Sequence, residues 1–450
     1  MIDNTYDIVV IGGGIAGSLC AVSAGRMGSS VLLVEECGSL GGSLVNSGTG
    51  PMMTFHAGKK QVIKGITDEL IQRLVKKNLS VGHIVDSTGY TYTVTPFDSE
   101  GMKRELELMA LEANVTILYH TMLSSVTKNE GEITSVDLLS CGIHFSVSAK
   151  IFVDASGDGD LIMNAGIPFR CGRDSDGLNQ PMTMNFKLSC VDIDMIRSLM
   201  DRDVSLFPFL KDKPGIQHVA ERLSCSGFQN IMKRGIKDGK ISFDRDIVLF
   251  FETNTRNEVI VNMSRINGFN PVDPIAISKA EVEGRRQVWE LYDFMKKEIP
   301  GFSNAKLIGS GPNIGVRSSR RMIGIYTVTV ADILNQRRFD DSIACCGYPV
   351  DIHSSDGAKT DSTFLPYGTY YTVPLRCLIN SVVPNVIATG RLVSCSFEAH
   401  ASMRVSPCCG AMGHAAGVLA SLCVQNHQVP GNLEYGKVRN RLLDEGAFLG

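Results

Sequence analysis

The chain has 450 residues, of which 44% are hydrophobic and 20% are charged, with a single tryptophan. This length allows two or three domains with a large core, and the composition is that of an ordinary folded protein rather than a disordered or fibrous one. Because the formal net charge is −3 and no run of lysine or arginine occurs, nucleic acid is not expected as a partner, and a small molecule is.

The N-terminus and the cysteines indicate the cellular environment. The opening MIDNTYDIVV has neither the basic nor the apolar region of a secretion signal, and no membrane segment is expected. Thirteen cysteines in such a chain are typical of a reducing compartment, so a cytoplasmic location is predicted. The vicinal pairs at 345–346 and 408–409 lack the spacings of zinc or iron–sulfur sites, and no metal is predicted. Nothing in the sequence indicates the oligomeric state.

The most informative pattern lies in residues 6–35. An apolar, β-branched run at 6–11 predicts a strand buried on both faces, and a glycine turn follows at once. A helix with small residues is expected next, ending near Gly28, and a second strand at 31–34 leads to Glu35. Strand, glycine turn, helix, strand and acid in this order predict a Rossmann-type dinucleotide-binding unit.

The glycine turn fits G-x-G-x-x-G, and each of its positions has a physical role. Gly12 allows the tight turn, Gly14 lets the backbone approach a pyrophosphate, and Gly17 lets the helix meet the strand. Ile15 and Ala16 open the helix between these glycines, and the phosphate charge is expected at the helix N-terminus. The turn is therefore predicted to hold the diphosphate of a dinucleotide.

Residues 35–43 bear on which dinucleotide is bound. Glu35 is expected to bind an unphosphorylated adenosine ribose, and Glu36 is a second candidate that fits better as a solvated neighbour. Gly41, Gly42 and Ser43 follow the second strand closely. This second glycine pair favours FAD over NAD because FAD is the longer ligand, and an ordinary glycine-rich turn is the alternative.

With these motifs the chain resembles the FAD-dependent oxidoreductases of the glutathione-reductase-like, two-dinucleotide-binding superfamily, whose V-x-L-V-E pattern matches residues 31–35. Two later segments carry the same resemblance: KIFVDASGDGD at 150–160, with a serine where threonine is usual, and NVIATGR at 385–391 with the glycine-rich stretch that follows. The resemblance implies a helix N-terminus directed at the isoalloxazine from near residue 407, although packing is an alternative role for most of these glycines. The further cofactor-binding residues it implies are Val126, Ala155, Ser156, Gly157, Asp158, Gly390, Arg391, Pro407, Gly410 and Gly413.

Within that superfamily the chain is most similar to bacterial FAD-dependent oxidoreductases. DASGDGD at 154–160 and GVRSSRRMIG at 315–324 carry this similarity, and weaker matches extend it over most of the chain. Relatives often have an acidic residue where this chain has Ser318 and Ile325, so no role of those carboxylates is transferred.

The predicted fold class is α/β: a discontinuous Rossmann-type FAD-binding domain with an inserted α+β substrate domain. The expected parts are FAD-binding segments at 1–55, 100–165 and 371–450, the last with the C-terminal tail, a helical insertion at 56–99 and a substrate or cap domain at 166–370. Helices are expected at 59–76, 100–111 and 279–297, and strands at 116–126, 180–188, 247–251 and 258–263.

Four arginines are candidates for the catalytic site, where the flavin performs the redox step and the protein supplies position and charge. Arg317, Arg320 and Arg321 follow a glycine in an apolar stretch, and their guanidinium groups suit a substrate carboxylate or phosphate. A structural ion-pair cluster is the alternative. Arg404 lies just before the presumed flavin-facing helix, where fumarate-reductase-like relatives carry a substrate-contacting arginine.

Two histidines, His353 and His400, are candidate acids or bases near the flavin, and His56 is a weaker one. Asp351 shares a face of an extended segment with His353 and is placed to orient it. The sequence thus predicts an FAD-dependent oxidoreductase that acts on a small, possibly anionic, organic substrate by hydride transfer to or from the flavin. The alternative is a flavin-bearing electron-transfer subunit of a larger redox complex, which would ordinarily add iron–sulfur cysteine motifs.

Overall fold

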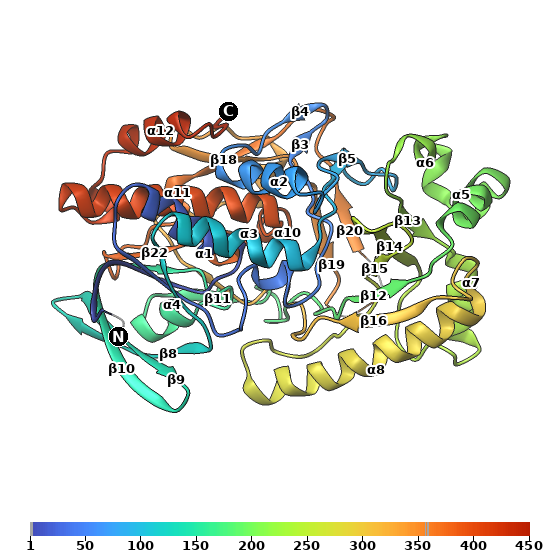
Figure 1. Cartoon of the computed structure of the whole chain (residues 1–450), viewed down its shortest axis with the longest axis horizontal. Helices are drawn as coiled ribbons and strands as arrows, with labels where there is room; N and C mark the ends of the chain where they lie inside the picture. Colours follow the sequence, from blue (N-terminus) through green and yellow to red (C-terminus); the bar gives the residue numbers. More distant parts are fainter. Residues whose placement is uncertain (1–2, 356, 358–359) are drawn as a thin grey trace.

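A mixed sheet forms the centre of the larger part of the molecule (Figure 1). The computed structural model describes residues 3–355, 357 and 360–450. Within these residues the sheet has seven strands, in the order β7-β2-β1-β10-β9-β8 with β22 paired to β10. The strands are β1 (Thr5–Ile11), β2 (Val31–Val34), β7 (Thr116–Leu118), β8 (Thr121–Asn129), β9 (Glu132–Ser140), β10 (Ile143–Asp154) and β22 (Val386–Ala388). Pairing is parallel from β7 to β22 through β10, whereas β9 and β8 add an antiparallel extension.

The apolar run at the N-terminus forms a strand buried on both faces, as predicted. Along β1, Ile8 and Val10 join the core on one side of the sheet, whereas Val9 and Ile11 join the core on the other. This is the periodicity of a strand, whose successive side chains point to opposite faces. The α/β class and the Rossmann-type sheet predicted from the sequence are confirmed.

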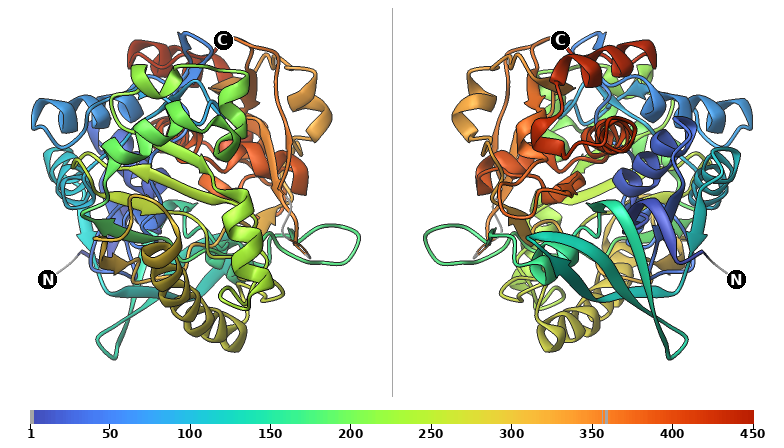
Figure 2. Two further views of the ribbon diagram at one scale, coloured as in Figure 1. Left: turned by 90° about the vertical axis from the view of Figure 1, so that its right-hand side faces the viewer. Right: turned by 90° about the vertical axis from the view of Figure 1, so that its left-hand side faces the viewer.

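Helices α1 and α11 lie side by side on one face of this sheet (Figure 2), and the short helix α4 packs on the other face. The close approach depends on glycine, because a Cβ at Gly413 would lie 2.2 Å from the carbonyl oxygen of Ala16. Among the described residues one helix, α11, is long and apolar enough to cross a membrane, and 83% of its most apolar window is buried inside the fold. The helices of this part are α1 (Ile15–Arg26), α2 (Ile66–Lys76), α3 (Ser99–Glu112), α4 (Asp160–Ala165), α9 (Val330–Leu334), α10 (Phe397–Met403), α11 (Ser406–Asn426) and α12 (Tyr435–Asp444).

A second, antiparallel sheet has its own core. Its order is β13-β14-β15-β12-β16, and its bounds are β12 (Phe186–Ser189), β13 (Ser224–Gly227), β14 (Val248–Glu252), β15 (Val259–Val261) and β16 (Lys306–Ser310). The helices with it are α5 (Ile193–Arg202), α6 (Ile216–Val219), α7 (Gln229–Lys237) and α8 (Pro274–Glu298). Helix α8 begins five residues earlier than predicted because Asp273 caps it by accepting from the amide of Ala276.

Five two-stranded pairs complete the described structure. They are β3 (His56–Ala57) with β4 (Lys60–Gln61), β5 (Ile84–Val85) with β6 (Thr93–Val94), β11 (Phe169–Cys171) with β17 (Arg320–Met322), β18 (Ser342–Cys346) with β21 (Tyr371–Pro374), and β19 (Val350–His353) with β20 (Thr360–Thr363). Residues 56–99 therefore hold one helix and short hairpins, so a purely helical insertion is too simple. The domain boundaries themselves stay a prediction.

The helix expected at 59–76 begins only at Ile66, because Lys60–Gln61 form β4 and pair with β3. Two further predicted elements differ from the observed ones for local reasons. The strand expected at 180–188 is regular only in β12, because the preceding residues bond to loops: the amide of Gln180 donates to Ser318, and Thr183 bridges to Gly315. The strand expected at 116–126 is split into β7 and β8 at His120, whose φ of 52° interrupts the extended backbone.

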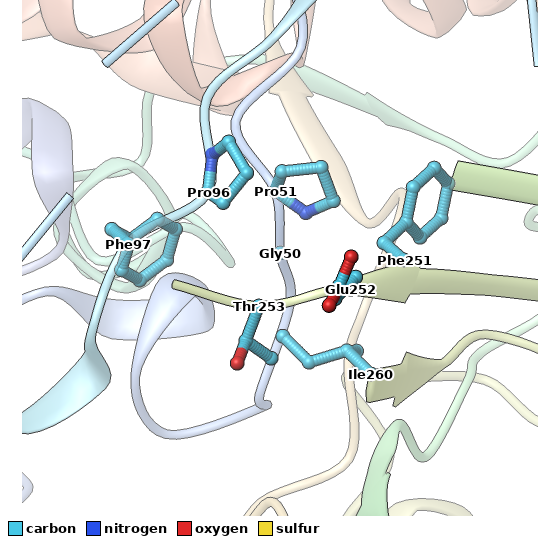
Figure 3. Close-up of a pocket in the computed structure, with 8 residues that line it drawn as sticks. All are labelled: Gly50, Pro51, Pro96, Phe97, Phe251, Glu252, Thr253 and Ile260. Atoms are coloured by element: carbon cyan, nitrogen blue, oxygen red, sulfur yellow. The ribbon is translucent and has the colours of Figure 1, made fainter. Parts of the chain in front are cut away.

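Loops of the first part pack against the second sheet along a seam that is mostly apolar. A gap of about 10 Å³ lies there. Figure 3 shows Pro51 and Phe97 from the loops, with Phe251 and Ile260 of the second sheet, around it. The gap is too small for a ligand, so at this place the two parts are packed together rather than separated by a cleft.

Candidate active site

A cavity of about 620 Å³ lies where the carboxyl ends of β1, β2 and β10 face the second sheet. Its walls come from the turns after those three strands, from the segments at 389–391 and 404–409, and from one face of the second sheet. In open α/β sheets, ligands bind outside the carboxyl ends of the strands. The cavity therefore lies where the sequence pattern predicts the dinucleotide.

The glycine turn after β1 forms one end of the cavity, and Gly12, Gly14, Ile15 and Ala16 all line it. A Cβ at Gly14 would meet nothing nearer than the Cα of Gly42 at 3.9 Å, so the protein itself leaves that space open. Helix α1 starts here with no side-chain cap and no acid in its first turn. Its first N–H groups are therefore available to an anion such as a diphosphate.

Other glycines of the motif shape the turn from behind. Gly12 has φ of 99°, and a Cβ on it would lie 2.5 Å from the carbonyl oxygen of Ala155. Gly17 does not line the cavity, and its Cβ would collide with the carbonyl oxygen of Gly12 at 1.8 Å. Gly41 also lies outside the cavity and donates its amide to the carbonyl of Gly13 at 2.9 Å. The structure thus gives Gly17 and Gly41 packing roles.

Both glutamates at the end of β2 line the cavity, together with Gly42 and Ser43. The Glu35 carboxylate accepts the amides of Gly13 at 2.6 Å and Cys37 at 2.8 Å. Burial raises the pKa of Glu35 even though these two N–H groups favour its charged form. Glu35 therefore also holds the glycine turn in shape, whereas Glu36 is exposed.

The turn after β10 lines the cavity with Ala155, Ser156, Gly157 and Asp158. The Ser156 hydroxyl donates to Asp154 at 2.7 Å and accepts the amides of Gly159 and Asp160. Serine in place of the usual threonine therefore makes the hydrogen bonds of the turn by itself.

Residues 389–391 lie next to that turn. Gly390 and Arg391 line the cavity, and the Arg391 guanidinium binds Asp158 at 2.7 Å. The buried Thr389 hydroxyl also lines the cavity and has no hydrogen-bond partner within the described part of the chain. A buried hydroxyl without a partner is costly, so a ligand with a polar group at this place would satisfy it.

Helix α11 also begins at the cavity, with Val405 as its N-cap and no side-chain cap. Val405, Ser406 and Cys409 line the cavity, so the helix N-terminus is directed into it as expected for an isoalloxazine.

Besides Gly17 and Gly41, four further residues predicted to bind the cofactor lie outside the cavity. Pro407 is buried in the first turn of α11, a Cβ at Gly410 would meet the side chain of Thr67, and Gly413 packs on α1. Val126 lies within β8. The two glycines allow close helix packing, so we do not carry a cofactor contact forward for these four residues.

The observations at this end fit FAD. Two helix N-termini without side-chain caps, open space over Gly14 and an unpartnered hydroxyl at Thr389 suit a ligand with a diphosphate and further hydrogen-bonding groups.

Cationic side chains gather where the cavity meets the second sheet. Arg317 and Arg404 both line it, as does Arg245, which the sequence did not single out. Burial, reinforced by neighbouring arginines, lowers the pKa of Arg245 to about 10 and that of Arg317 to about 9. The Nε atoms of Arg245 and Arg404 are buried and find no hydrogen-bond partner among the described residues. These guanidinium groups therefore retain donors for a ligand.

Asp351 is the carboxylate among these arginines. It binds His353 Nε2 at 3.2 Å, accepts the Tyr90 hydroxyl at 2.9 Å and the Tyr348 hydroxyl at 3.3 Å, and lies 3.9 Å from Arg404. Burial alone would raise its pKa, but the charges and donors around it outweigh burial and hold the pKa well below its usual range. Asp351 is therefore charged and orients His353, the pairing that the spacing of the two residues suggested.

His353 is held on both ring nitrogens. Its Nδ1 lies 3.1 Å from the Thr360 hydroxyl, opposite the bond from Nε2 to Asp351. Burial lowers the pKa of His353 to about 4; Asp351 opposes this and Arg317 adds to it. The imidazole is therefore neutral at pH 7, with its proton on Nε2 towards the carboxylate.

The remaining catalytic candidates do not reach the cavity. His400 is buried behind it, with Nε2 donating to the carbonyl of Arg391 at 3.0 Å, and burial among arginines lowers its pKa well below the usual value. Arg320 binds the carbonyl of Asp158 at 2.8 Å. His56 pairs with a threonine hydroxyl in a separate group around His83. His400 and Arg320 thus support the backbone of the cofactor loops.

Sequence reasoning missed the contribution of the second sheet. Arg245 stands in an irregular loop before β14, where no motif marks it. Tyr90 lies between β5 and β6, far from Asp351 in the sequence. The one available signal was β14 itself, which is apolar at successive positions and therefore must bury both of its faces.

The sheet order, the glycine turn and the elongated cavity define a dinucleotide-binding protein of the Rossmann type. Over residues 7–442 the chain matches the family described as FAD dependent oxidoreductase, and it belongs to that family. It is therefore an FAD-dependent enzyme.

More distant relatives cover only parts of the molecule. Digeranylgeranylglycerophospholipid reductase 1 of Methanococcoides burtonii is 27% identical over 164 residues, which are 34% of this chain and 38% of that protein. A 1H-pyrrole-2-carbonyl peptidyl-carrier-protein brominase of Pseudoalteromonas luteoviolacea is 25% identical over 36% of this chain and 40% of that protein. The chain thus spans about two fifths of the length of these curated relatives.

Among solved structures, one of a geranylgeranyl bacteriochlorophyll reductase-like protein from Thermoplasma acidophilum is similar in fold. The superposition covers 99% of this chain and 84% of that protein's chain, with 13% sequence identity and a TM-score of 0.49.

Proposed function

We propose that this enzyme transfers a hydride between FAD and a small organic substrate that carries a negative charge. The observation that supports this is the excess of positive charge at the second-sheet end of the cavity, where Arg245, Arg317 and Arg404 line the wall with Asp351, and a second carboxylate, Asp246, acts on Arg245 from outside the cavity. Buried charge without a partner is unfavourable, so an anion that enters here is stabilised by both Coulomb attraction and charge-assisted hydrogen bonds.

Bound FAD supplies the acceptor or the donor of the hydride. Arg404 and Arg317 bind the anionic group and hold the substrate in one orientation, which excludes water from the reacting carbon. A substrate that gives up a hydride in oxidation also gives up a proton, and Nδ1 of His353, which the Thr360 hydroxyl now occupies, is the place that takes it. Asp351 stabilises the imidazolium that results. In the reverse direction the same nitrogen returns the proton.

The N-terminus of α11 acts on the flavin end. Its free N–H groups around Ser406 and the helix dipole stabilise negative charge that develops on a ring placed against them. This assignment explains why the helix begins without a side-chain cap, which would occupy the same N–H groups.

The test is anaerobic reduction of the purified holoenzyme, followed at the flavin absorption band, with hydroxy acids, sugars, unsaturated acids and NAD(P)H. We expect anionic compounds to reduce the flavin, or to reoxidise the reduced enzyme if they are unsaturated, and their uncharged amides to fail. If uncharged analogues react as fast as the acids, the proposed anionic substrate is wrong.

We also propose three finer assignments. The parallel sheet with an antiparallel extension on β10 supports placement in the glutathione-reductase-like superfamily. The separate core around β12–β16 supports an inserted substrate domain within residues 166–370. The thirteen free cysteines support a reducing, cytoplasmic location.

A further inference from the structure

We propose that the substrate is an amphipathic carboxylate, whose anionic head lies among the arginines and whose apolar body lies against the second sheet. This inference rests on the proposed function and adds to it the chemistry of the part of the substrate that does not carry charge. It follows from an apolar wall in the cavity, formed by Phe209, Ile247, Leu249 and Phe251.

The wall is one face of a strand that is apolar on both faces. Along β14, Val248 and Phe250 are fully buried in the core of the second part, whereas Leu249 and Phe251 line the cavity. Leu249 is only half-buried. If this face of the strand were exposed to solvent alone, polar residues would be expected on it, in alternation with the apolar residues of the core. An apolar ligand that covers them removes this exposure.

Polarity changes in one direction along the neighbouring strand β15 and its continuation. Phe251 pairs with Ile260 at the apolar end. Two residues further, the amide of Asn262 donates to Leu249, and the carbonyl of Asn262 accepts from Arg245 at 3.3 Å.

Two residues beyond that, the carbonyl of Ser264 accepts from Thr183, whose hydroxyl in turn accepts from Arg317. The same cavity wall thus runs from apolar through mixed to cationic within a few residues of one strand. A dicarboxylate would place its second charge on the apolar end, whereas a monocarboxylate with an apolar chain matches both ends.

The size of the effect follows from burial. Each methylene that moves from water onto the wall should increase affinity roughly fourfold, the value expected for full burial of a CH₂ group. The increase should end at the chain length that fills the wall. An uncharged compound of the same length loses the head-group contacts and should bind weakly.

The experiment is titration of the FAD-loaded enzyme with acetate, butyrate, hexanoate, octanoate, succinate and octanamide, with binding measured by calorimetry and by the change in the flavin spectrum. The variant is Leu249→Asn, which keeps the size of the side chain and makes it polar. The matched control is Ile308→Asn on β16 of the same sheet, whose side chain is 53% exposed and outside the cavity. FAD content per protein is measured for each variant.

We expect affinity to rise with chain length in the wild type and in Ile308→Asn. In Leu249→Asn we expect roughly tenfold weaker hexanoate binding with acetate within about twofold of wild type. Equal affinity for all chain lengths, or stronger binding of succinate than of hexanoate, overturns the amphipathic substrate but leaves an anionic one. Equal binding of octanamide and octanoate overturns the proposed function as well. Loss of FAD from Leu249→Asn with an unchanged chain-length dependence would show that the wall covers the cofactor, which also contradicts the inference.

Discussion

Replacement of Arg404 by lysine tests the charge at the centre of the site. The Arg404 guanidinium has five N–H donors, and among the described residues it makes a 3.4 Å contact to Gln180 and a 3.9 Å approach to Asp351. Most of its donors are therefore free for a bidentate contact with a carboxylate. Lysine keeps the positive charge but cannot form the planar, bidentate pair of hydrogen bonds with a carboxylate. Its side chain is also shorter, so its charge would lie farther from the negative charge of Asp351.

For Arg404→Lys we expect flavin reduction by substrate to slow about 10²–10³-fold, the cost of removing one preorganised electrostatic contact. The assay is single-turnover anaerobic reduction at saturating substrate, with FAD content and the thermal unfolding midpoint measured alongside. Arg285→Lys is the control, because Arg285 is an exposed residue of α8 that pairs with Glu281. An unchanged rate constant would give Arg404 a structural role, whereas loss of FAD would make it a cofactor ligand.

Three further predictions concern the cofactor, the packing of α11 and the response to acid. Gly14→Ala should fold normally, because the added Cβ meets no protein atom nearer than 3.9 Å, but should bind FAD poorly, because the Cβ enters the space for the diphosphate. Circular dichroism measures the folding and the flavin content measures the binding. A full FAD content would contradict the prediction. Gly413→Ala should lower the free energy of unfolding by about 1–3 kcal/mol, because its Cβ would lie 2.2 Å from the Ala16 carbonyl oxygen. The control Gly431→Ala should change this free energy little, because its Cβ meets nothing within 4 Å. Equal denaturation midpoints for the two variants would refute the packing role of Gly413. The pKa of His353 is lowered from 6.5 to about 4 in the folded protein. Between these pH values the unfolded chain binds more protons than the folded one, so the free energy of unfolding falls as the pH drops. The stability that neutral His353 contributes is fully present above about pH 6.5. His353→Gln should remove up to about 2 kcal/mol of the loss in unfolding free energy between pH 6.5 and 4.5, measured by urea denaturation, and an unchanged loss would contradict the assigned pKa.

Residues 6–35 could be interpreted from the sequence because their structure is decided by neighbours in the chain. The strand, the glycine turn and the second strand each have a local pattern, and the structure places β1, α1 and β2 within a residue or two of the expected bounds. Gly12 and Gly14 were assigned by the same local logic, since a tight turn and an open helix N-terminus depend on only a few residues.

The catalytic end of the cavity could not be predicted because it is assembled from distant segments. His353 and His400 are both plausible bases in the sequence, and only the packing of α10 turns His400 away from the cavity and towards the Arg391 carbonyl. Arg245 reaches the site because its loop meets the segment that directly follows β15, where it donates to the carbonyl of Asn262. For the same reason Gly410 and Gly413 fit both a flavin motif and a helix contact, and three-dimensional packing decides between these roles.

The cavity described above has walls from many separated stretches of the chain, between residue 12 and residue 409. A cofactor that touches all of them acts as a non-covalent cross-link. Its binding free energy adds to the stability of the folded state, by about 2.7 kcal/mol at a hundredfold excess over Kd. The site cannot be complete until synthesis has passed residue 409, because the start of α11 forms part of its wall. The availability of FAD during folding, as much as the sequence of the enzyme, should therefore determine how much active protein a cell accumulates.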